Sequence, residues 1–140
     1  MGIQRGTGCV GPRLATAGTS SVVTDMNIEL QSTKAAPTEA RRAIHDCLGD
    51  SLPAATVHEL GIVTTELVTN AVEHGPGEPI RVRIAVEPEG TVRGEVDDRG
   101  SGRIALGRSG LGLMIVDALA DSWVPREGAG PVRFALSAAR

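Results

Sequence analysis

The stretch ELGIVTTELVTNAVEHG, residues 59–75, places three polar side chains four positions apart. They are Glu66, Asn70 and His74, and in an α-helix this spacing stacks side chains on one face. Apolar residues recur through the same stretch at helical spacing: Leu60, Val63, Leu67 and Ala71. At about 100° per residue the polar row lies beside the apolar one. We therefore expect a carboxylate, an amide and an imidazole at the rim of a hydrophobic core.

Taken alone, such a row is more typical of a solvated helix face than of a binding site. Two later glycine-rich stretches favour a site. DRGSG, residues 98–102, places an acid and glycines at the end of a predicted strand, and GRSGLG, residues 107–112, leads directly into a predicted helix. Each stretch by itself is typical of an ordinary turn. Together with the polar row, they indicate a site for a phosphorylated ligand.

The chemistry of these groups suits a nucleotide. Glycines let a backbone approach phosphates, and free amides at a helix N-terminus favour anions, which places a polyphosphate near Gly110 and Gly112. An aspartate such as Asp98 can accept a hydrogen bond from the exocyclic amine of adenine, a contact worth about 1.5–3 kcal/mol. The amide oxygen of Asn70 can bind Mg²⁺. The carboxylate of Glu66 can act as a general base near a γ-phosphate.

The composition excludes several other classes of function. The 140 residues fit one domain. Trp123 and Phe134 are the only aromatic residues, which excludes an aromatic platform for stacking bases. The net charge of −3 and the absence of a long basic run predict no direct contact with nucleic acid. The sequence has neither an apolar run of membrane-spanning length nor a signal-peptide pattern, so we expect a cytoplasmic protein without membrane contact.

Cysteine and lysine usage narrows the chemistry further. The two cysteines, Cys9 and Cys47, provide neither a disulfide framework nor the spacing of a metal site. We expect both to be free thiols. Lys34 is the only lysine and no GxxxxGK[ST] stretch occurs, so a P-loop is excluded.

A single folded unit must position the three polar stretches. We expect residues 1–25 to form a flexible leader, because they are rich in Gly, Ser, Thr and Ala without apolar periodicity. Residues 26–140 then form one domain. Hydrophobic periodicity and turn residues predict these elements: a strand at 26–31, helices at 38–48 and 54–74, a hairpin of strands at 80–86 and 91–97, a helix at 110–120, and strands at 123–124 and 132–136. This order predicts an α+β fold, a two-layer α/β sandwich whose mostly antiparallel, mixed sheet carries three helices on one face.

The three polar stretches resemble the N box, G1 box and G2 box of the GHKL ATPases, whose ATP-binding fold is called the Bergerat fold. ELVTNAVEHG, residues 66–75, and GLGLMIVDALAD, residues 110–121, are similar in particular to bacterial anti-sigma-factor serine kinases and their actinobacterial relatives. The resemblance covers roughly residues 27–136. It implies that the protein binds ATP with Mg²⁺.

The resemblance also implies roles for individual residues. Glu66 would be the catalytic base, Asn70 the Mg²⁺ ligand and Asp98 the acid that recognises adenine. Asp97 is the rival for the adenine contact, but Asp98 has the expected spacing to the glycines that follow. The remaining residues implied at the nucleotide are His74, Gly100, Gly102, Arg108, Gly110, Leu111 and Gly112.

One departure from the family leaves two functions open. Only Arg103 to Ser109 lies between the second and third stretches, whereas the family usually has a longer lid that folds over ATP. The first hypothesis is an anti-sigma factor with serine/threonine kinase activity toward an anti-anti-sigma partner. The alternative is a non-catalytic, ATP-binding module that switches between partners. The sequence does not decide whether the protein forms a homodimer.

The sequence excludes a metalloprotease of the HExxH type, because Ile62 occupies the position of the second His.

Overall fold

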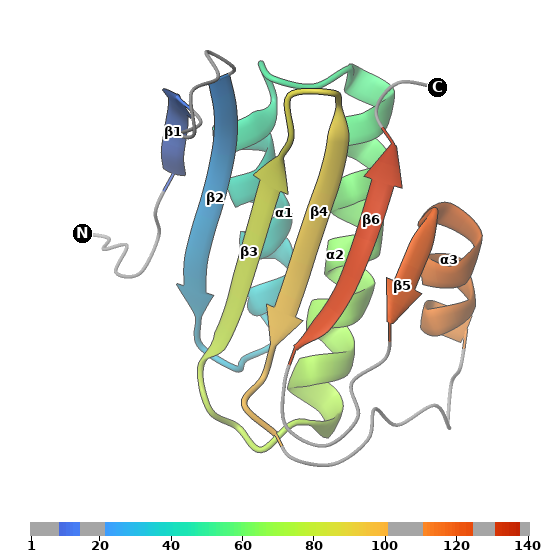
Figure 1. Cartoon of the computed structure of the whole chain (residues 1–140). Coiled ribbons are helices and arrows are strands. Elements are labelled where there is room, and N and C mark those ends of the chain that lie inside the picture. The colour runs from blue at the N-terminus through green and yellow to red at the C-terminus, as the bar shows by residue number, and fades with distance from the viewer. Residues whose placement is uncertain (1–8, 15–21, 101–110, 125–130, 138–140) are drawn as a thin grey trace.

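The protein is a two-layer structure in which helices cover one face of a single sheet (Figure 1). The computed structural model describes residues 9–14, 22–100, 111–124 and 131–137, and the side-chain surroundings of residues 25–100, 114–124 and 131–137. The helices are α1 (Ala36–Leu48), α2 (Ala54–His74) and α3 (Leu111–Leu119). The strands are β1 (Cys9–Leu14), β2 (Val22–Leu30), β3 (Ile80–Val86), β4 (Thr91–Asp97), β5 (Ser122–Val124) and β6 (Val132–Ser137).

The six strands lie in the order β1-β2-β3-β4-β6-β5. Every described pair is antiparallel. The prediction of an α+β sandwich with three helices is confirmed, but the sheet is antiparallel rather than mixed. A tight turn joins β3 to β4. Strand β6 pairs with β4 in the opposite direction.

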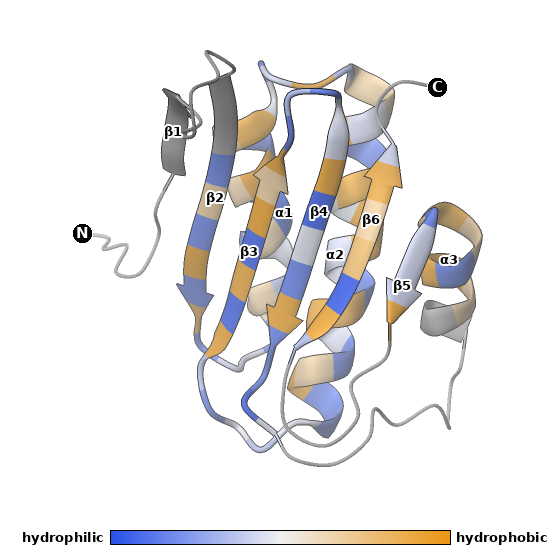
Figure 2. Cartoon of the chain, in the orientation of Figure 1, coloured by the Kyte–Doolittle hydropathy of each residue, from blue (hydrophilic) through white to orange (hydrophobic). Residues whose placement is uncertain are grey.

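Alternation along the central strands determines which face of the sheet is buried. On β3, Ile80, Val82 and Ile84 are buried and Arg81 and Arg83 are exposed. Figure 2 shows this alternation as apolar and polar bands along the strand. Because neighbouring strands are in register, the apolar residues of one strand meet those of the next, and helices α1 and α2 cover them. The opposite face of the sheet carries the charged residues.

Helix α2 has the predicted bounds and the predicted buried seam. Leu60, Val63, Leu67 and Ala71 are all buried. The helix follows Pro53, and at its end the backbone N–H of Gly75 donates to the carbonyl of Ala71 at 2.8 Å. The polar row therefore lies on a helix whose apolar side is buried in the core.

A glycine on β4 makes room for the only phenylalanine. Gly94 pairs with Phe134 across β4 and β6. A Cβ at Gly94 would overlap the aromatic ring of Phe134. The ring thus occupies the space that a side chain at position 94 would fill, and Phe134 is only 4% exposed.

The N-terminal part of the chain differs from the prediction. Strand β2 begins at Val22 rather than Met26, and residues Cys9–Leu14 form β1 along its edge. The predicted flexible leader, residues 1–25, therefore contains strand-forming segments. Val22, Val23 and Thr24 are β-branched, and such residues favour a strand. The preference is hard to recognise in the sequence, because the residues before them are rich in Gly, Ser, Thr and Ala.

The prediction of two free thiols was also wrong. Cys47, half-buried on α1, is disulfide-bonded, and the described part of the chain contains no free cysteine. The sequence has one other cysteine, Cys9, which begins β1. Strand β1 is in contact with α1, a proximity that cannot be read from two cysteines far apart in a sequence.

Candidate functional site

Asp98 lies directly after β4 and is the buried acidic residue among those described, with 8% exposure. Its Oδ1 accepts a hydrogen bond from the backbone N–H of Gly100 at 2.8 Å. Its Oδ2 faces the end of α2, where a Cβ built on Gly75 would lie 2.7 Å away. The strand end and the helix end thus meet at this carboxylate.

Gly75 is a residue of the site that was not among the residues predicted to meet the nucleotide. Its φ of −82° is accessible to any residue, so the backbone conformation does not require glycine. Glycine is needed here because there is no room for a side chain, which would overlap the carboxylate of Asp98 and the carbonyl of Ala71. The signal in the sequence was its position, immediately after the polar row.

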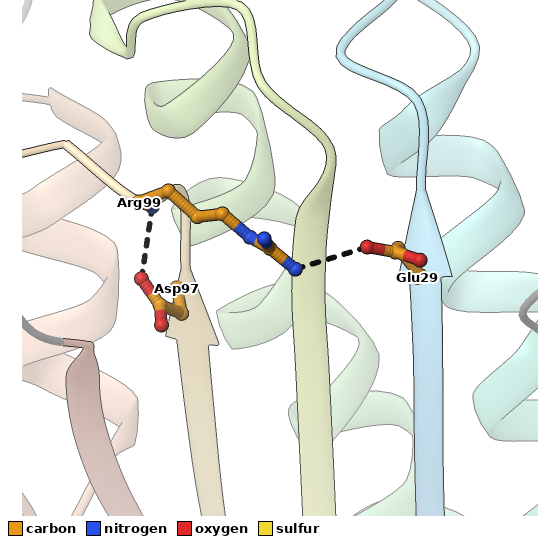
Figure 3. A network of polar contacts seen from close by, with 3 residues as sticks. All are labelled: Glu29, Asp97 and Arg99. Atoms are coloured by element: carbon orange, nitrogen blue, oxygen red, sulfur yellow. Dashed lines mark hydrogen bonds and ion pairs between the residues drawn. The ribbon is translucent and has the colours of Figure 1, made fainter.

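Asp97 faces the other side of the sheet. It follows Arg93 and Glu95 in the alternation of β4, whereas Asp98 follows buried Val96. The Oδ1 of Asp97 accepts a hydrogen bond from the backbone N–H of Arg99 at 2.8 Å (Figure 3). Asp97 therefore holds a turn on the charged face, which supports Asp98 over Asp97 as the carboxylate that meets a ligand.

The polar row runs along α2 toward Asp98. Glu66 and Asn70 are half-buried, whereas His74 is exposed, with Nε2 3.9 Å from Glu73 Oε1. At 1.5 Å per residue, Glu66 lies about 13 Å along the helix axis from Gly75. The site is therefore elongated, with the buried acid at one end and the half-buried carboxylate and amide at the other.

This arrangement fits a nucleotide with Mg²⁺. Asp98 contributes a buried carboxylate, whose Oδ2 packs so closely against the backbone of Gly75 that a Cβ there would lie 2.7 Å away. No group of three His, Cys, Asp or Glu residues in the described part of the chain could hold a metal. Mg²⁺ commonly takes one or two protein oxygens and completes its shell with waters and phosphates. Asn70, with Glu66 one turn away, offers such oxygens.

The remaining predicted residues fall partly outside the described chain. Gly102, Arg108 and Gly110 lie outside it, as does the connector from Arg103. Leu111 and Gly112 begin α3, as predicted to within one residue, but their surroundings are not described. Helix α3 is in contact with α2, so the third stretch leads into an element that packs against the helix of the polar row.

Two hollows lie elsewhere on the described surface. One, of about 470 Å³, lies between α1 and α2 and is lined in part by Arg41, His58 and Gly61. The other, of about 380 Å³, lies on the charged face of the sheet beside Arg83. Neither is lined by Glu66, Asn70 or Asp98, so the candidate site does not coincide with either hollow.

Comparisons with known proteins place the chain in a family and show a structure with a similar fold. A family model described as the histidine kinase-like ATPase domain matches residues 30–134. A solved structure, of the RsbU and RsbW domains of Rv1364c from Mycobacterium tuberculosis, is similar with a TM-score of 0.64 and 27% sequence identity. The match covers 81% of this chain and 31% of that one, so the chain spans about a third of that protein's length. No curated protein matches the sequence. No helix among the described residues is long and apolar enough to cross a bilayer.

Proposed function

Because the chain belongs to the histidine kinase-like ATPase domain family, we propose that it binds ATP with Mg²⁺ and regulates a partner protein. The observation that carries the proposal is the buried carboxylate of Asp98 beside Gly75. The carboxylate accepts a hydrogen bond from the backbone N–H of Gly100, and because a carboxylate has several acceptor sites, the amine of adenine would supply a further donor. A guanine carbonyl at the same place would instead face a second acceptor.

Asn70 and Glu66 would act at the phosphate end of the nucleotide. The Asn70 amide oxygen would bind Mg²⁺, which would neutralise charge on the phosphates. Glu66, half-buried one turn earlier on α2, would accept the proton of an attacking hydroxyl.

We propose a serine/threonine kinase that acts as an anti-sigma factor. Its substrate would be a serine of an anti-anti-sigma protein with a small α/β domain, and its other partner would be a sigma factor. The similarity to the RsbW-containing structure supports this choice, together with the ELVTNAVEHG stretch. The alternative, a non-catalytic module that binds partners according to its nucleotide, is favoured by the short connector between residues 102 and 110.

Titration calorimetry with Mg-ATP and Mg-GTP tests the proposed ligand. We expect binding of ATP and at least about tenfold weaker binding of GTP, since guanine presents an acceptor where adenine would donate, so that one hydrogen bond to a charged group is lost. Equal affinity for both nucleotides would contradict the role of Asp98. No binding of either would contradict the proposed function itself.

A phosphotransfer assay distinguishes a kinase from a non-catalytic binding module. It measures the transfer of phosphate from ATP to the cognate partner, which is identified by co-purification from the native host. Glu66→Gln keeps the size and polarity of the side chain but removes the base. We expect it to retain ATP binding and to slow transfer by about 10²–10⁴-fold. ATP binding without any transfer in the unchanged protein would leave the partner-switching module as the function.

A further inference from the structure

Arg99 has an unusual backbone conformation. Its φ is +65°, and it is the only non-glycine residue with positive φ in the described part of the chain. Side chains with a Cβ disfavour this left-handed region, and residues held there depend on their surroundings. Arg99 lies between Asp98 and Gly100, the residues that form the buried end of the candidate site.

Two contacts hold Arg99 in this conformation, and Figure 3 shows both. Its backbone N–H donates to Asp97 Oδ1 at 2.8 Å. Its guanidinium Nη2 donates to Glu29 Oε2 at 3.0 Å. Glu29 lies on β2, two strands away, so the side chain of Arg99 reaches across β3 on the charged face of the sheet.

The register of the sheet makes this reach possible. Glu29 pairs with Arg81, and Arg81 pairs with Asp97. Glu29 and Asp97 therefore lie in one row across β2, β3 and β4, with Arg99 bridging the two ends. The network is anchored on residues of the sheet at both ends, and the turn between Asp97 and Gly100 has little freedom to rearrange.

The backbone conformation of Arg99 affects Asp98, whose side chain lies on the opposite side of the same turn. A return of Arg99 to negative φ would redirect the chain after Asp98 and break the bond from Gly100 N–H to Asp98 Oδ1. We propose that Glu29, Asp97 and Arg99 are positioning residues that orient Asp98 toward the 6-amino group of a purine from the far face of the sheet. This inference rests on the proposed ATP binding and names what sets its base specificity.

If Arg99 and Glu29 had only a structural role, substituting them would not change the preference for the 6-amino group. The side chains of Arg99 and Glu29 are 40% and 39% exposed, and ion pairs at such sites contribute little to stability. Arg133 and Glu95 form a similar cross-strand pair at 3.4 Å on the same face. Glu95→Gln is therefore a matched control, since it disrupts a pair of the same kind that does not bear on Asp98.

Glycine at position 99 offers a second control. Glycine adopts positive φ without a Cβ penalty, so Arg99→Gly should keep the turn although it removes the guanidinium. Arg99→Ala removes the same anchor but retains the unfavourable Cβ. Positioning of Asp98 should therefore survive in Arg99→Gly better than in Arg99→Ala.

Calorimetry with the whole chain tests the inference, using Mg-ATP and the triphosphate of purine riboside, which lacks the 6-amino group. We expect Arg99→Ala to weaken ATP binding by about tenfold, the size of one hydrogen bond to a charged group. Glu29→Gln should weaken it by about threefold, within the range for an exposed pair. Arg99→Gly and Glu95→Gln should bind ATP as the unchanged protein does. Binding of the purine analogue should be the same in all variants, so the preference for the amine falls only where Asp98 is displaced.

Several outcomes would overturn the inference. Unchanged ATP binding in both Arg99→Ala and Glu29→Gln would do so while leaving ATP binding itself intact. Equal losses for ATP and the purine analogue would show a general structural role. If Arg99→Ala does not fold, Glu29→Gln decides, because it leaves the backbone sequence of the turn unchanged. Failure of the unchanged protein to bind ATP would instead remove the proposed function on which the inference rests.

Discussion

The carboxylate of Asp98 and the backbone of Gly75 are packed so closely that a methyl group cannot fit between them. A Cβ on Gly75 would lie 2.7 Å from Asp98 Oδ2. The contact joins the end of α2, which carries the polar row, to the end of β4. It fixes the distance between the acid that would recognise a base and the residues that would bind phosphates.

Gly75→Ala is expected to weaken nucleotide binding by about tenfold or more, because the new methyl group must displace the Asp98 carboxylate and lose its hydrogen bond. Gly61→Ala is the matched control on the same helix, where a Cβ would make ordinary contact with Arg41 Cγ at 3.4 Å. It should leave binding unchanged and stabilise the helix by about 0.5–1 kcal/mol. Calorimetry and thermal unfolding of both variants check this. Equal affinity in Gly75→Ala and the unchanged protein would contradict the close packing.

Gly94→Ala is expected to destabilise the fold by about 1–3 kcal/mol, the usual cost of adding a methyl group to a packed core. The methyl group would overlap the ring of Phe134. Urea denaturation measures the loss. Adding Phe134→Leu to Gly94→Ala should recover part of it, since residues in contact show non-additive effects. Strict additivity of the two substitutions would show that Gly94 and Phe134 do not constrain each other.

Reduction of the disulfide at Cys47 is expected to lower the free energy of unfolding by about 2–4 kcal/mol. Thermal unfolding with and without dithiothreitol measures the difference. Cys47→Ser should melt at the temperature of the reduced protein and be insensitive to the reductant. Peptide mapping without reduction should link the Cys47 peptide to the Cys9 peptide within one chain. A linkage between two chains would contradict an intramolecular bond.

Strong periodicity made much of the fold predictable from the sequence. Helix α2 and the β3–β4 hairpin were located to the residue, because their apolar positions repeat over many residues between clear turn signals. Strand β1 was missed, since a strand on the edge of a sheet in a Gly- and Thr-rich segment has no pattern of its own. Its pairing with β2 is a tertiary contact.

The candidate site was predictable as a set of residues but not as a geometry. Spacing identified Asp98 and ranked it above Asp97, yet only the fold shows that one faces α2 and the other the charged face of the sheet. The pairing of Arg99 with Glu29 joins residues 70 positions apart. It depends on the register of three strands, which no local pattern encodes.

We propose that Asp98 recognises the base of ATP, and the most direct test of this role compares Asp98→Asn with the unchanged protein. The substitution keeps the shape of the side chain and removes its charge. We expect calorimetry with Mg-ATP to show a loss of about ten- to a hundredfold in affinity, equivalent to about 1.5–3 kcal/mol for a hydrogen bond to a charged group, while the melting temperature without nucleotide changes little. Unaltered affinity in a folded Asp98→Asn protein would contradict the account.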